Sequence, residues 1–338
     1  MSQIARQYTF PLPVRLLQRL IQKSTYPVLT IGAVCFFSLL GFFAATGVLY
    51  PGFVQQAGLN PLESTGLSLL MSSLPAYMLM CLAAQVRAMP DIKAALRRIL
   101  PASHRGREAA LDHGRHWWLG ALLGVAFAIT SNINWDSFAL GPDGRTTYAV
   151  GVVTGQFILW GTVGLMLHLK IHNALVLHKL GKLVQVDIFN PDRLNVFGRV
   201  GLNDLLVVVG AMALTPLQSI DQEFRWINYA NAVWVGVPSA ITLMLLPIWS
   251  VHRRILRTRQ AELVLINAQI DLLPKSLEPA AVEQLNALLD RRNHVQHSRN
   301  WPMDVTIFAK VVFYVLIPPL AWAGAALVEL LIDAYIVG

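Results

Sequence analysis

Seven stretches of 16 or more residues carry no Asp, Glu, Lys or Arg, and they limit the folds open to this chain. They are residues 26–50, 64–86, 117–135, 146–169, 205–220, 226–251 and 311–328. The hydrocarbon core of a bilayer is crossed by about 20 apolar helical residues, with a range of roughly 17–25. Six stretches satisfy this length, and the fifth, 205–220, does so if Asp204 or Asp221 lies at a boundary. The pattern predicts an all-α integral membrane protein with seven transmembrane helices.

The basic residues predict the orientation of these helices. With seven spans, 25 of the 27 Lys and Arg residues fall on one side, and only Arg145 and Arg225 fall on the other. Basic loops stay in the cytoplasm, so we expect the N-terminus inside and the C-terminus outside. A bacterial inner (plasma) membrane is the expected location. The net charge of +8 follows from this topology and from contact with anionic lipid, so a nucleic-acid partner is not expected.

The segments outside the spans are expected to form basic cytoplasmic elements. Residues 1–25 form an amphipathic segment in which Arg15, Arg19 and Lys23 share one helical face. Two basic loops follow at 87–116 and 170–204. Residues 252–303 show two apolar helical patterns separated by Pro274, which predicts a helical hairpin before the last span at 304–338. The apolar stripes on both arms of this hairpin predict that it packs against itself, against residues 170–204 or against a neighbouring subunit.

Catalytic motifs are scarce in this chain. The sequence holds no phosphate-binding loop, nucleophile elbow or H-E-x-x-H motif, so we predict neither an enzyme nor a cofactor. Histidines at helical spacing are the weak candidates for metal ligands, because residues three or four apart share a helix face. The three pairs are His113 with His116, His168 with His172, and His294 with His297. This pattern partly resembles the histidine boxes of membrane fatty-acid desaturases and hydroxylases, and the resemblance implies a cytoplasmic metalloenzyme.

The last span has the features of a pore-lining helix. Pro318 and Pro319 remove two backbone donors at mid-membrane, which predicts a kink or local unwinding. Small residues including Gly324 follow and allow close helix approach. Glu329 and Asp333 lie one turn apart near the predicted outer end, where a symmetric oligomer would stack them as acidic rings.

The seven-span layout is similar to that of insect odorant and gustatory receptors, which are tetrameric cation channels whose last helix lines the pore. That similarity implies a homo-oligomer that conducts inorganic ions, and a cation-preferring channel is our first prediction. A non-catalytic membrane scaffold or regulatory subunit is the alternative, and a transporter or histidine-ligated metalloenzyme is a further one. The lipid bilayer is the partner that all of these share.

Overall fold

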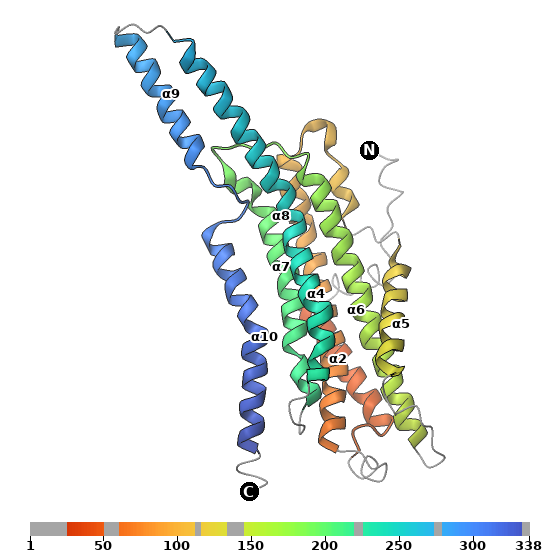
Figure 1. The fold of residues 1–338 in the computed structure, drawn as a ribbon. Coiled ribbons are helices and arrows are strands. Elements are labelled where there is room, and N and C mark those ends of the chain that lie inside the picture. Colours follow the sequence, from red (N-terminus) through yellow and green to blue (C-terminus); the bar gives the residue numbers. More distant parts are fainter. Residues whose placement is uncertain are drawn as a thin grey trace.

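A computed structural model describes residues 26–50, 61–111, 116–133, 145–219, 226–273 and 279–332 (Figure 1). The described chain is helical and contains no strand, which confirms the all-α prediction. The amphipathic segment 1–25 lies outside the described residues. The α-helices are α2 (Pro27–Ala45), α4 (Pro61–Ile99), α5 (Trp117–Ile133), α6 (Arg145–Gly181), α7 (Asn195–Ala213), α8 (Trp226–Asp271), α9 (Pro279–His297) and α10 (Val305–Ile332). Short 3₁₀ helices connect them: η2 (Ala102–His104), η3 (Arg107–Ala110), η5 (Pro191–Leu194) and η6 (Thr215–Ser219).

Six of the described helices are long and apolar enough to cross a membrane: α2, α4, α6, α7 with its flanking turns, α8 and α10. The predicted third span corresponds to α5, a shorter apolar helix of 17 residues. Its 17 described residues stand at the lower limit of the range of roughly 17–25 that crosses a bilayer core, and residues 134–144 after it are not described. A multi-pass membrane protein is therefore supported, and the seventh crossing stays a prediction.

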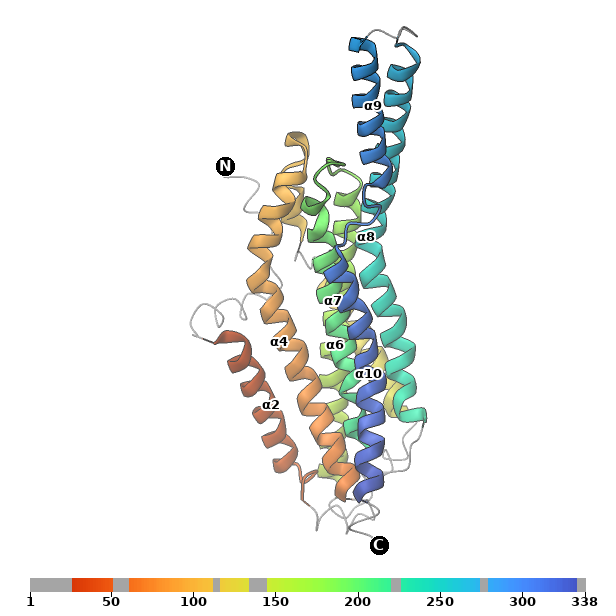
Figure 2. The same ribbon diagram turned by 90° about the vertical axis from the view of Figure 1, so that its left-hand side faces the viewer.

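The helices α2, α4, α5, α6, α7, α8 and α10 form one elongated bundle (Figures 1 and 2). From α2 to α8 each runs opposite to the one before it, and α10 runs opposite to α8. The end of α4, the end of α6 and the start of α7 meet where α8 leaves the bundle. Arg97, Arg98, Lys179 and Arg253 lie on these segments, so we call this the basic end. Beyond it, α8 continues and pairs with α9 as a hairpin that projects away from the bundle (Figure 2).

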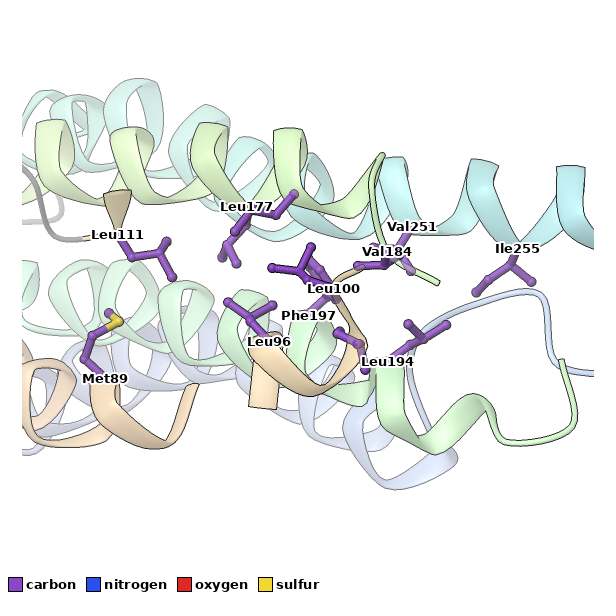
Figure 3. Close-up of a cluster of buried hydrophobic side chains, with 12 residues drawn as sticks. Met89, Leu96, Leu100, Leu111, Leu177, Val184, Leu194, Phe197, Val251 and Ile255 are labelled. Atoms are coloured by element: carbon purple, nitrogen blue, oxygen red, sulfur yellow. The ribbon is translucent and has the colours of Figure 1, made fainter. Parts of the chain in front are cut away.

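A cluster of buried apolar side chains fixes the basic end (Figure 3). Leu96 on α4, Leu177 on α6, Phe197 on α7 and Val251 on α8 belong to it, and each is at most 1% exposed. The backbone N–H of Gln185 donates to the carbonyl of Ile99 at 2.9 Å, which ties the α6–α7 connection to the end of α4. The predicted basic loops at 87–116 and 170–204 are thus largely helical and packed together.

Glu108 anchors the turn after α4. Its side chain is fully buried, and it accepts hydrogen bonds from the Arg97 guanidinium and from the backbone N–H of Gly106. Burial alone would raise the pKa of the Glu108 carboxyl, but the Arg97 charge and the backbone donors hold it below its ordinary value. This contact therefore stabilises the fold above the ordinary carboxyl pKa, and its contribution is lost as the pH falls through the lowered value.

The two arms of the hairpin pack on one another, and the base of the hairpin contacts the segment that leads into α10. Ile266 on α8 and Val295 on α9 are buried between the arms, and Arg291 forms an ion pair with Glu262 across them. At the base, His252 Nδ1 lies 2.7 Å from the carbonyl of Asn300, and its ring stacks on Trp301. Self-packing of the arms, which the sequence predicted as one option, is present within a single chain.

Glycines bring α5 and α6 into backbone contact. A side-chain carbon added to Gly164 of α6 would lie 2.4 Å from the carbonyl oxygen of Gly120 and 2.5 Å from the backbone nitrogen of Gly124, both on α5. Close approach of this kind is how small residues pack membrane helices without a hydrophobic driving force. By contrast, a side-chain carbon added to the nearby Gly161 would meet open space.

We predict that Gly164→Ala pushes α5 off α6, because backbone atoms cannot move aside as a flexible side chain can. The expected cost is about 1–3 kcal/mol, as for overpacked interiors. Thermal unfolding in detergent, followed with a thiol-reactive dye on the partly buried Cys35 and Cys81, measures it. Gly161→Ala is the matched control and should have the same melting temperature as the wild-type protein. Equal melting temperatures for both variants would contradict the close packing of α5.

Candidate functional site

A buried ion pair lies inside the helical bundle. The Lys170 ammonium on α6 donates to Asp204 Oδ1 on α7 at 2.6 Å, and each side chain is 4% exposed. Ionisable groups within membrane spans are expensive to desolvate, and those that persist commonly mark functional sites. This pair is therefore the starting point for the candidate site.

The sequence analysis placed Lys170 and Asp204 in the segment 170–204 between two spans, and the structure places both residues inside helices. The fourth uncharged stretch ends at Leu169 and the fifth begins at Leu205, whereas α6 continues to Gly181 and α7 already begins at Asn195. The two charges are buried together because each supplies the countercharge of the other.

A cavity of about 630 Å³ extends from this ion pair between α4, α6, α7 and α8. Its volume lies within the range of about 300–1,000 Å³ that small-molecule sites occupy. The lining residues come from four long helices, from η6 and from Thr130 on α5. Lys170 is the charged residue in this lining, and Thr130, Gln156, Ser239, Thr215 and Gln218 supply further polar groups.

The remaining lining is apolar and rich in methionine. Met71 and Met78 on α4, Met166 on α6 and Met212 on α7 all face the cavity. Methionine is unbranched and polarisable, so it adapts its shape to apolar ligands. An apolar wall with a few separated polar groups is typical of ligand sites. The arrangement favours binding of a molecule that is mostly hydrocarbon.

The predicted pore residues of α10 do not line this cavity. Pro318 is buried against the bundle, whereas Pro319 and Gly324 are exposed. The sequence predicted a kink or local unwinding at these prolines, and of the two the local unwinding is wrong, since α10 is an unbroken helix through both. Proline fixes φ near the helical value, so the lost donors do not force the backbone out of a helix. The side chain of Glu329 and all of Asp333 lie outside the described residues.

The α10 helix docks on the bundle through one aromatic residue in particular. The indole N–H of Trp322 donates to the carbonyl of Met212 at 3.1 Å, and its ring packs against Tyr229 with centroids 5.3 Å apart. Met212 also lines the cavity. One residue thus contacts both the candidate ligand site and the last span.

The histidine pairs are arranged differently from the sequence prediction. His168 lies close enough to His116 and His172 to interact with both electrostatically, so two predicted pairs approach one another. His172 Nε2 lies 3.3 Å from the carbonyl of Ala110, and the Nδ1 atoms of His294 and His297 lie near carbonyls of their own helix. His113 lies outside the described residues. Within the described ranges no group of three or more His, Cys, Asp or Glu residues is placed to hold a metal ion.

Comparison with known proteins places no constraint on the function. No protein-family model, curated protein or solved structure matches this chain. Any function must therefore be argued from the site itself.

The sequence analysis missed the ion pair and the cavity, although one pattern pointed toward them. Lys170 and Asp204 directly flank two neighbouring uncharged stretches, and one of these stretches was too short by itself to span. Extending both helices by one turn would have placed opposite charges at the same depth. Gln156 was hidden because a single neutral amide does not interrupt an apolar stretch.

Asp204→Asn should destabilise the protein strongly, because it leaves the Lys170 ammonium buried without a countercharge. Breaking one side of such a pair costs about 3–5 kcal/mol. The double variant Lys170→Met with Asp204→Leu removes both charges at similar volume and should unfold close to wild type. The melting temperatures of the purified wild-type protein, the single variant and the double variant test this prediction. A single variant as stable as wild type would show that the pair does not stabilise the bundle.

Proposed function

We propose that this protein binds a small, predominantly apolar molecule in the intramembrane cavity, as a membrane receptor or carrier. The cavity itself carries this proposal: about 630 Å³ of space with an apolar, methionine-rich wall and few polar groups. The absence of a phosphate-binding loop from the sequence fits a protein whose work is binding.

The energetic cost of an empty cavity supports an occupant. Cavities left by core substitutions destabilise proteins by about 24 cal/mol per Å³. The space between these helices is partly open to its surroundings, so the rate does not apply to it in full, but its apolar wall still favours an apolar occupant over water. Water recovers little of that cost against an apolar wall. An apolar occupant recovers it through dispersion contacts.

Filling the cavity should abolish binding. Ser239 lines the cavity from α8, so Ser239→Phe should reduce binding of an environment-sensitive apolar fluorophore at least tenfold by occupying its space. Val237 is 41% exposed on the same helix, and Val237→Phe is the matched control that should bind like wild type. Fluorescence titration of purified protein in detergent gives both affinities. Unchanged binding by Ser239→Phe would remove the cavity from consideration.

We also propose that the basic end of the bundle lies in the cytoplasm of a bacterial inner membrane. The support is electrostatic, since described segments at this end carry most of the basic residues, and basic segments resist translocation. In this orientation the Lys170–Asp204 pair lies toward the cytoplasmic leaflet, and the α8–α9 hairpin projects into the cytoplasm.

A homo-oligomeric cation channel is the second candidate function, and the surface of α10 favours it. This helix lies at the edge of the bundle (Figure 1), and Phe313, Leu316, Leu320 and Leu327 are at least 50% exposed. A side-chain carbon added to Gly324 would meet no atom of the chain. Such a face is available for packing against α10 of other subunits around a pore. The scaffold and metalloenzyme alternatives have no comparable support.

If α10 lines a cation pore, the double variant Glu329→Gln with Asp333→Asn should lower selectivity for cations over anions, because the acidic rings concentrate cations at the mouth. Reversal potentials in planar bilayers under a salt gradient measure the selectivity. The exposed hairpin acid Glu283 gives a control, Glu283→Gln, that preserves it. Selectivity that survives in the double variant would argue against this pore.

A further inference from the structure

The cavity is elongated along the bundle axis. Its lining includes residues at every turn of α6 from Gln156 through Leu159, Val163 and Met166 to Lys170. Fourteen residues separate the two ends, which at 1.5 Å per residue corresponds to about 21 Å. A space of this length suits an extended alkyl chain that lies along α6.

Gln156 marks the end of this space away from the ion pair. The residue is 6% exposed and lines the cavity, and no hydrogen bond joins its amide to another residue in the described ranges. The amide offers two donors and two acceptor positions. Its nitrogen and oxygen are not among the fully enclosed polar atoms that lack a partner, so they reach the cavity space, where a ligand can bond to them. Gln156 is therefore available as a hydrogen-bonding group for a ligand in the cavity.

The turn η6 makes this end more polar. Since α6 and α7 are antiparallel and the ion pair sets Lys170 level with Asp204, Gln156 lies about level with η6. Thr215 and Gln218 line the cavity from that turn. The hydroxyl of Thr215 donates to the Met212 carbonyl at 2.7 Å, so its oxygen can still accept a hydrogen bond.

The opposite end disfavours an additional charge. Lys170 is already neutralised by Asp204, and it is the charged residue in the cavity lining. A carboxylate or phosphate entering here would give the buried site a net negative charge, which is expensive to desolvate. An uncharged ligand avoids that penalty and leaves the pair intact.

From the elongated apolar cavity and the partnerless Gln156 amide, we infer that the ligand is a single-chain amphiphile with an uncharged hydrogen-bonding headgroup. The headgroup lies against Gln156, and the hydrocarbon chain extends along α6 toward the Lys170–Asp204 pair. This inference rests on the proposed ligand-binding function and names the chemical class of its ligand: a long-chain alcohol, amide or ester, not a fatty acid anion.

The test uses the full-length protein in detergent and hexadecan-1-ol with a photoactivatable diazirine in its chain. Labelling is quantified by mass spectrometry of the intact protein, and labelled peptides are mapped. We expect saturable labelling within α4, α6, α7 or α8, displaced by hexadecanol at least tenfold better than by hexadecanoate. Gln156→Leu should weaken alcohol binding about tenfold, the loss expected for one buried hydrogen bond. The apolar fluorophore should bind this variant as it binds wild type.

Controls separate this inference from the proposed function. Gln260→Leu makes the same substitution at an exposed position outside the cavity and should bind like wild type. Gln156→Met replaces Gln156→Leu if the latter is not monodisperse. The inference is overturned if the Gln156 variant binds the alcohol as well as wild type does. It is also overturned if wild type binds the fluorophore but not the alcohol. Both outcomes leave the proposed function standing. If neither the fluorophore nor the alcohol binds wild type, the proposed function fails as well.

Discussion

The ion pair between Lys170 and Asp204 sets the geometry on which the rest of the bundle depends. Neither charge is tolerable alone in an apolar interior, so α6 and α7 must keep the register that holds them 2.6 Å apart. That register places Gln156 about level with η6. It also accompanies an α6 that continues to Gly181, well beyond the end of the uncharged stretch at Leu169. Because a one-turn slip of either helix would separate the charges by about 5 Å, the pair specifies one arrangement where apolar packing alone would permit several.

The two ends of the bundle are built on different principles. At the basic end, side chains such as Leu96, Leu177 and Phe197 form a close-packed core, and buried Glu108 fixes the returning turn. In the interior the same helices separate enough to leave the cavity, which the ion pair bounds on the side of that core. The stability of the closed end can offset the cost of the interior space, since strain and voids at functional sites persist only where the surrounding structure holds them.

Helix existence could be predicted from the sequence because a run of about 20 apolar residues without charge has the length and polarity of a membrane-spanning helix. Helix ends could not be predicted, because compensation by a distant residue is invisible in a single segment. Lys170 directly follows an uncharged stretch, yet α6 continues beyond it to Gly181. The cavity depends on how four helices diverge. The binding role proposed for Gln156 depends on its lying in that cavity without a hydrogen-bond partner in the described ranges. Neither property is periodic along the chain.

The binding and channel proposals meet at Met212. Its side chain faces the cavity, and its carbonyl accepts the hydrogen bond by which Trp322 docks α10. A ligand that changes the packing of Met212 therefore changes the position on which α10 rests. Contact alone does not establish coupling, which requires that the ligand bind the two arrangements of α10 with different affinity. If it does, reciprocity follows: whatever partner fixes α10 in an oligomer must alter ligand affinity by the same factor. One shared residue would then make a binding protein and a channel two descriptions of the same molecule.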